Sequence, residues 1–219
     1  MGSSEPLVKA DFDIGWKRWR HVPEIAELLL QHQKGDVLDV GCATCQNYSF
    51  LRERGWKGKY YGIDIAKYEG EDYPDGISLT IGDANKLKFP EVDTVILYDI
   101  LEHVDDPASL LKKALSAARK NVLIALPMRN EEMWRLGIAE THQVDKTHKH
   151  AGFSKEEVEK LVSISGGKIA SCRNLGKATA IIGVNFWEGW FPKKLFYLMG
   201  RLFKSKAYYW GIWCEVVRQ

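Results

Sequence analysis

Five short runs of apolar residues, separated by more polar stretches, dominate the first 127 residues of the chain. They are GDVLDVG (35–41), KYYGID (59–64), ISLTIGD (77–83), DTVILYD (93–99) and NVLIALP (121–127). Each run has the length of a strand, and four of the five end at a glycine or an aspartate, where a strand gives way to a turn. The pattern therefore predicts five strands.

Helical patterns lie between and around these runs. Asp106 can cap a helix that begins at Pro107, and Ser154 with Glu157 forms a capping box for a second helix. A third helical pattern covers 16–33, where apolar residues recur behind Pro23 at helical spacing. Each pattern has one apolar face, so we expect each helix to pack against the sheet.

The alternation of strands and helices defines the expected fold class. Parallel strands need crossover connections, and the crossover helices cover both faces of the sheet. We therefore predict an α/β, doubly wound, mostly parallel sheet with helices on both faces. The closing sequence AYYWGIWCEVVRQ (207–219) alternates like a last strand, which we expect to be antiparallel.

The domain organisation follows from where this rhythm breaks. We expect a flexible tail over 1–10 and a single domain over 11–219. The aromatic-rich stretch 178–206 interrupts the rhythm and is predicted to be a helical insertion or lid. Between Gly189 and Cys214 there are five basic residues and no acidic one, a composition that permits peripheral membrane contact through 189–206.

Composition narrows the class of protein. The chain has 31 basic and 29 acidic residues, a balance that does not favour a nucleic-acid partner. It shows no signal peptide and no apolar run long enough to span a membrane. Its four cysteines are too few and too unevenly spaced for a disulfide scaffold, so we expect reduced thiols and a cytoplasmic location.

Candidate binding residues gather at the ends of the predicted strands. Asp39 lies near the end of the first strand, and Asp64, Asp83 and Asp99 follow the next three. The carboxyl ends of parallel strands meet at one edge of a sheet, where ligands of this fold class bind. Gly41 in the first turn lets the backbone approach such a ligand closely.

These motifs, in this order, resemble those of class I S-adenosylmethionine-dependent methyltransferases. VLDVGCATC is similar to the family's first motif, in which D-x-G-C-G-x-G follows two hydrophobic residues. LEHV after the fourth strand and DKTHKHAGFS after the fifth resemble segments of the small-molecule branch. The resemblance spans about 37–154 and implies a Rossmann-like methyltransferase fold with S-adenosylmethionine as cofactor.

The resemblance also implies a set of site residues. Cofactor contacts are expected at Asp39, Gly41, Cys42, Ala43, Asp64, Ile65, Asp83, Ala84 and Asp99. His148 is the candidate catalytic residue, as a proton acceptor or as a contact to the methyl acceptor. The expected reaction is direct displacement at the sulfonium, with a small-molecule or lipid-like acceptor. Positioning supplies most of the rate in such a reaction, so a strong base is optional.

Two residues depart from the family pattern. Ala43 and Cys45 stand where the family has glycines, and a backbone that requires positive φ there is costly for both. This departure leaves open a non-catalytic S-adenosylmethionine-binding sensor or partner subunit. Methylation of RNA or protein is a further alternative. A nicotinamide dehydrogenase fits less well, because its glycine-rich turn must admit a pyrophosphate.

Cysteine and histidine clusters offer two other interpretations. Cys42 and Cys45 form a C-x-x-C at a strand-to-helix turn, an arrangement found in redox proteins. The loop with His142, His148 and His150 has no paired cysteines and no helical H-E-x-x-H arrangement, so the sequence predicts no metal site there.

Overall fold

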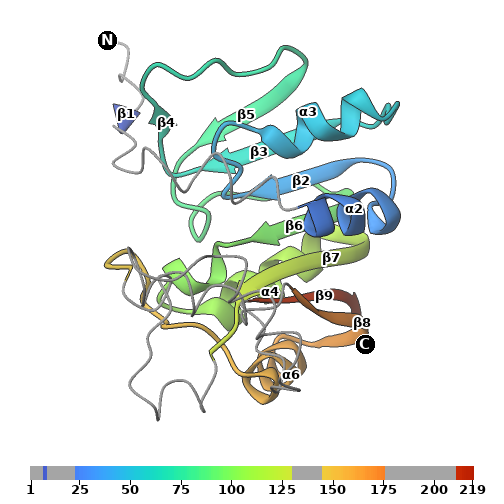
Figure 1. Cartoon of the computed structure of the whole chain (residues 1–219), viewed down its shortest axis with the longest axis vertical. Coiled ribbons are helices and arrows are strands. Elements are labelled where there is room, and N and C mark those ends of the chain that lie inside the picture. Colours follow the sequence, from blue (N-terminus) through green and yellow to red (C-terminus); the bar gives the residue numbers. More distant parts are fainter. Residues whose placement is uncertain (1–6, 9–22, 130–144, 176–210) are drawn as a thin grey trace, which may run out of the picture.

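A computed structural model describes residues 7–8, 23–129, 145–175 and 211–219. A seven-stranded sheet with the strand order β5-β3-β2-β6-β7-β9-β8 forms its centre (Figure 1). The five parallel strands are β2 (Val37–Val40), β3 (Tyr60–Asp64), β5 (Ile77–Ile81), β6 (Val92–Tyr98) and β7 (Ala118–Pro127). These are the five strands that the apolar runs predict.

The last strand, β9 (Gly211–Arg218), runs antiparallel to β7, as predicted, and pairs Gly211 with Pro127. On its other side β9 pairs, also antiparallel, with the edge strand β8 (Gly167–Leu175). The hydrophobic pattern did not predict β8. Its exposed and half-buried positions are mostly polar, so its place is set by pairing with β9 rather than by an apolar run of its own.

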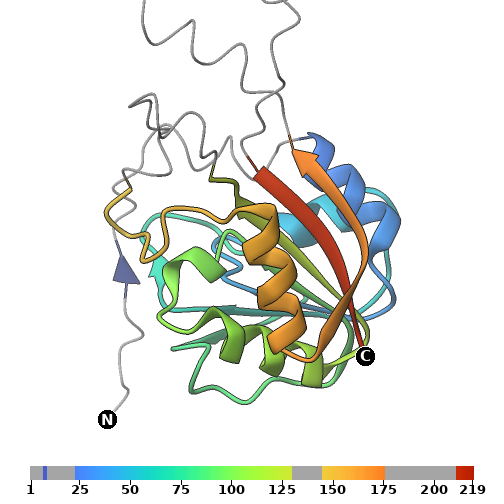
Figure 2. The same cartoon turned by 90° about the horizontal axis from the view of Figure 1, so that it is seen from below.

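Helices cover both faces of the sheet, which confirms the doubly wound architecture (Figure 2). Helices α2 (Pro23–His32) and α3 (Gln46–Glu53) pack on one face. Helices α4 (Pro107–Ala117) and α6 (Lys155–Ile164) pack on the other. A short 3₁₀ turn, η1 (Leu101–His103), joins β6 to α4.

The predicted helix caps are present. Asp106 accepts a hydrogen bond from the backbone N–H of Ser109 at 3.0 Å, ahead of Pro107 in the first turn of α4. Ser154 and Glu157 exchange both bonds of a capping box at the start of α6. These bonds satisfy N–H groups that a helix start leaves without intrahelical partners.

Two residues of the predicted amino-terminal tail are described. Leu7–Val8 forms a short strand, β1, in parallel register with β4 (Lys67–Tyr68). The pairing places these two residues beside the segment that follows β3.

The expectation of four reduced cysteines is wrong for two of them. Cys172 on β8 and Cys214 on β9 are direct cross-strand partners and form a disulfide. They lie far apart in the sequence, and only the antiparallel pairing of the two strands brings them together. Cys42 and Cys45 are free, buried thiols.

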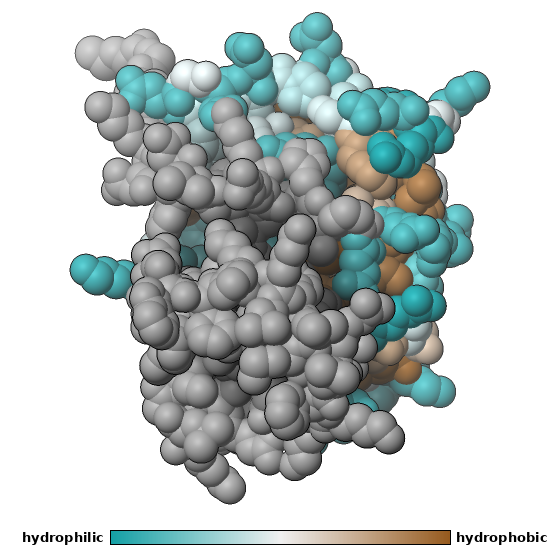
Figure 3. Space-filling model, viewed as in Figure 1, coloured by the Kyte–Doolittle hydropathy of each residue, from teal (hydrophilic) through white to brown (hydrophobic). Residues whose placement is uncertain are grey.

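The predicted insertion over 178–206 lies outside the described residues. Its neighbours in the chain, Leu175 and Gly211, are register partners at the edge of the sheet where the parallel strands end. The described surface in Figure 3 is largely hydrophilic along its margins, with apolar residues between. Within the described ranges, no helix combines the length and the apolar composition that crossing a bilayer requires.

Candidate active site

The turn between β2 and α3 has a left-handed backbone at three positions. Gly41, Ala43 and Cys45 have φ of 74°, 47° and 59°. Glycine adopts this region without cost, whereas an L-residue pays about 1–2 kcal/mol in it. The loop thus keeps the geometry of a glycine-rich turn although Ala43 and Cys45 fill two of its glycine positions, and both have the positive φ that is costly for a residue with a side chain.

Asp64 at the end of β3 holds this turn. Its Oδ2 accepts a hydrogen bond from the backbone N–H of Ala43 at 2.6 Å, and its Oδ1 accepts one from the N–H of Ile65 at 2.8 Å. The Asp64 residue is only 6% exposed, whereas Ile65 beside it is 63% exposed. An acidic group and an exposed apolar side chain therefore stand together at the strand end.

Asp39 lies deeper than the sequence suggests. It is 1% exposed, and its Oδ2 accepts hydrogen bonds from Asn47 Nδ2 at 2.9 Å and from the Tyr60 hydroxyl. Burial, with the Asp39 charge beside it, raises the pKa of Tyr60, so this hydroxyl stays a proton donor. Asp39 therefore supports the turn from beneath. Neither Asn47 nor Tyr60 is predicted from the sequence to support the turn.

Asp83 and Ala84 lie in the turn after β5. Asp83 accepts a hydrogen bond from the backbone N–H of Asn85 at 2.9 Å, and that bond, with Lys86 nearby, lowers the pKa of Asp83. Ala84 is half-buried against the core, and its carbonyl accepts a bond from Lys113 Nζ on α4. The turn is thus built to present a charged carboxylate at neutral pH.

Asp99 follows β6 with a φ of 50°, a strained conformation for a residue with a side chain. Its backbone N–H donates to the carbonyl of Ala125 on β7. Next to it, Ile100 lies so close to Gly41 that a Cβ there would be 3.1 Å from the Ile100 Cδ1. The ends of β2 and β6 therefore meet at the carboxyl edge, as predicted.

The two free cysteines do not support redox chemistry. Cys42 and Cys45 are fully buried, and a hydrogen bond with Cys45, together with burial, raises the pKa of the Cys42 thiol. Reactive C-x-x-C cysteines require the opposite shift, since the thiolate is the reactive form. These thiols fill the core beneath the turn, next to Gly62, where a Cβ would be 2.8 Å from the Cys42 Sγ.

The loop 145–150 crosses the η1 turn that follows Asp99. The backbone N–H groups of Lys149 and His150 both donate to the carbonyl of Glu102, at 2.8 and 3.1 Å. His103 Nδ1 lies 3.2 Å from the carbonyl of Thr147. These bonds fix the loop on the turn, so two segments distant in the sequence form one wall near the end of β6.

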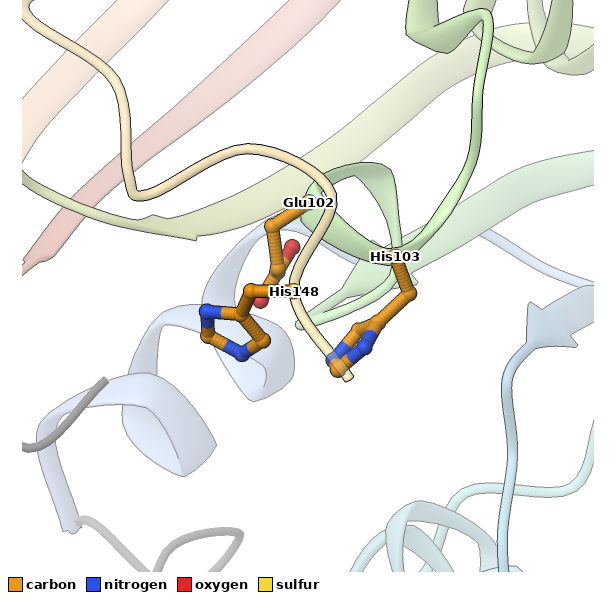
Figure 4. Close-up of side chains that lie close together, drawn as sticks. All are labelled: Glu102, His103 and His148. Atoms are coloured by element: carbon orange, nitrogen blue, oxygen red, sulfur yellow. The ribbon is translucent and has the colours of Figure 1, made fainter. Parts of the chain in front are cut away.

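This docking brings three side chains together. Glu102, His103 and His148 each present a ligand-type atom within 4.8 Å of those of the other two (Figure 4). Glu102 is 1% exposed. The rings of His103 and His148 pack edge to face, with their centroids 4.5 Å apart. His148 is a predicted site residue, whereas no role for Glu102 is predicted from the sequence. Its position in LEHV, two residues after Ile100, was the available signal.

The fold and this site together define a class I methyltransferase architecture. The strand order, the acidic strand ends and the left-handed turn after the first parallel strand all agree with it. Residues 17–171 match the family model described as a methyltransferase domain. The chain therefore belongs to the methyltransferase-domain family of S-adenosylmethionine-dependent enzymes.

Individual relatives agree with this assignment. The chain is 30% identical over 140 residues to a ubiquinone biosynthesis O-methyltransferase of Idiomarina loihiensis, a match that covers 54% of this chain and 55% of that protein. The chain thus aligns with only about half the length of this curated relative.

Solved structures share the fold. Magnesium protoporphyrin IX methyltransferase from Synechocystis PCC 6803, with bound SAH, superposes with a TM-score of 0.59 at 16% identity, over 95% of this chain and 90% of that one. A SAM-dependent methyltransferase from Archaeoglobus fulgidus superposes with a TM-score of 0.61 at 15% identity, over 91% of this chain and 96% of that one.

Proposed function

We propose that this chain transfers the methyl group of S-adenosylmethionine to an oxygen of a small, lipid-like acceptor. The observation that carries the proposal is that the Asp64-anchored turn and the Glu102–His148 wall follow neighbouring strands, β2 and β6, at the same edge of the sheet. The turn is suited to bind the cofactor, and the wall is suited to contact the acceptor. The O-methyltransferase relative supports oxygen as the methylated atom.

The residues present fit the cofactor. Asp64, buried at the end of β3, offers carboxylate oxygens to ribose hydroxyls, and the exposed Ile65 offers an apolar surface to an adenine ring. Asp83 and Ala84 lie at the neighbouring strand end, and Gly41 keeps the backbone open. When bound, the cofactor supplies an electrophilic methyl group on a sulfonium.

On the acceptor side, we assign to His148 the contact with the acceptor hydroxyl. The ring lies next to the carboxylate of the buried residue Glu102, and an imidazole is the side chain that most often acts as a general base. His148 is therefore suited to receive the proton that the hydroxyl loses on methylation. Asp99, with its positive φ, directly follows β6, the strand whose end leads to Glu102.

The test is a turnover assay that detects S-adenosylhomocysteine with a panel of hydroxylated aromatic acceptors that carry apolar tails. We expect acceptor-dependent product, and a fall in kcat of about 100-fold or more in His148→Ala, with the KM for S-adenosylmethionine little changed. Lys149→Ala is the matched control, because Lys149 lies in the same loop and its side chain forms an ion pair with the exposed Asp105.

Two outcomes would contradict the proposal. Cofactor binding without turnover on any acceptor would favour the sensor alternative that Ala43 and Cys45 raise. Product formed on RNA or protein, but not on small acceptors, would move the chain to macromolecular modification.

A further inference from the structure

We propose that Glu102, His103 and His148 form a binding site for one divalent transition-metal ion, with zinc as the best match. The chemistry of the three side chains points to it. Two imidazoles and one carboxylate are the protein ligands of known zinc sites that keep a fourth position open. The same set also binds iron(II) in other proteins, so geometry and availability decide between the metals.

The distances are close to those a zinc ion needs. The three ligand atoms lie within 4.8 Å of one another. In a tetrahedral site with bonds of about 2.1 Å, ligand atoms are roughly 3.4 Å apart. Small rotations about side-chain bonds would close this difference, and all three side chains come from backbone segments that hydrogen bonds already hold together.

A second layer of contacts orients the imidazoles. His103 Nδ1 faces the carbonyl of Thr147 at 3.2 Å, which directs the Nε2 of that ring to the cation. Asp145 Oδ2 lies 3.9 Å from His148 Nε2, and Asp145 itself accepts bonds from the N–H and hydroxyl of Thr147. Carbonyl and carboxylate partners of this kind hold metal-binding histidines in place.

The three side chains converge from two segments of the chain. Glu102 is 1% exposed and provides the carboxylate of the set. Figure 4 shows Glu102 and His103 leaving the η1 turn and His148 leaving the loop that crosses it, with the three side chains on the same side of the ribbon. A cation there would bridge the two segments.

The inference goes beyond the proposed function, since metal retention requires neither the cofactor nor the acceptor. It also has a consequence for that function. A bound zinc ion would take the lone pair of His148 and would itself lower the pKa of a coordinated hydroxyl. The loss of the acceptor proton would then depend on the metal, and His148 would act as a metal ligand instead of a proton acceptor.

The experiment uses untagged, chelator-treated full-length protein. Calorimetry with Zn²⁺ and visible absorption with Co²⁺ as a probe measure binding without S-adenosylmethionine. We expect one equivalent with a Kd of about 1 µM or tighter, a cobalt spectrum typical of four ligands, and a rise in Tm. In Glu102→Gln and His148→Gln, affinity should fall by at least about 10-fold and the rise in Tm should disappear.

His150→Gln is the matched control. His150 lies in the same loop and contacts the carbonyl of Val104, a bond that the glutamine amide can keep, so it should bind metal like the wild type. Circular dichroism of each variant without metal checks that it folds. Absence of stoichiometric binding, or binding that Glu102→Gln and His148→Gln leave unchanged, would overturn the inference. Neither result would affect turnover measured without added metal, so the two proposals fail separately.

Discussion

The carboxylate of Asp64 accepts a hydrogen bond of 2.6 Å from the backbone N–H of Ala43, and so ties the end of β3 to the turn after β2. Asp64 thereby holds a turn whose backbone has positive φ, and it lies at the end of β3, at the edge of the sheet where we propose that S-adenosylmethionine binds. The bond explains how a turn with two filled glycine positions keeps its left-handed geometry.

Ala43→Gly should relieve that strain. Ala43 has a φ of 47° and is 1% exposed, so the variant loses one buried methyl group, about 0.8 kcal/mol, and regains about 1–2 kcal/mol of backbone strain. We expect an unchanged or higher Tm in thermal unfolding, and affinity for S-adenosylmethionine up to roughly 10-fold tighter. Ala114→Gly, at a buried position inside α4, is the contrast and should lose about 2 kcal/mol, from helix propensity and one buried methyl group together. A lower Tm for Ala43→Gly than for Ala114→Gly would contradict this account.

Tyr60→Phe should weaken the support beneath the turn. The variant deletes a hydroxyl that donates to the buried carboxylate of Asp39, at a cost of about 1–3 kcal/mol in the free energy of unfolding. Urea unfolding measures it, with Tyr61→Phe on the same strand as the control, because Tyr61 is half-buried and faces the opposite side of the sheet. Equal losses in the two variants would show that the Asp39 bond contributes nothing.

Much of the fold, but less of the site, is predictable from the sequence. The apolar runs and the caps at Asp106 and Ser154 are local signals, and local signals set strands and helix starts. Strand β8 has no strong pattern of its own, and the Glu102–His148 contact depends on a loop docking across the sheet edge. Such long-range pairings arise from tertiary packing, which one sequence does not display.

The ion pair between Asp93 and Arg119 should account for part of the loss of folding stability at low pH. Hydrogen bonds from Arg119 lower the pKa of Asp93 to about 2 from the ordinary 3.8. A depressed folded-state pKa gives stability that is present above pH 4 and is lost as the pH falls toward 2. Because Arg119 is half exposed, we expect Asp93→Asn to cost only about 1 kcal/mol at pH 7. Urea unfolding at pH 7 and pH 2 tests this: the difference from wild type should vanish at pH 2, and a constant difference would contradict the ion pair.

The Cys172–Cys214 disulfide predicts a thiol count. Titration of unfolded protein with Ellman's reagent should find two thiols without reductant, those of Cys42 and Cys45, and four after reduction. Such a bond persists in oxidising compartments and is reduced in most cytosols, so the count bears directly on the predicted cytoplasmic location. Four thiols in non-reduced protein purified under air would show that the pair is not bonded.

The central claim is that the turn held by Asp64 binds S-adenosylmethionine, and calorimetric titration tests it most directly. We predict micromolar binding of S-adenosylmethionine and none of NAD. Asp64→Ala should lose at least about 10-fold in affinity, while Asp75→Ala, at an exposed acidic residue before β5, should match the wild type. Absence of S-adenosylmethionine binding, or equal affinity in the Asp64 variant, would contradict the account.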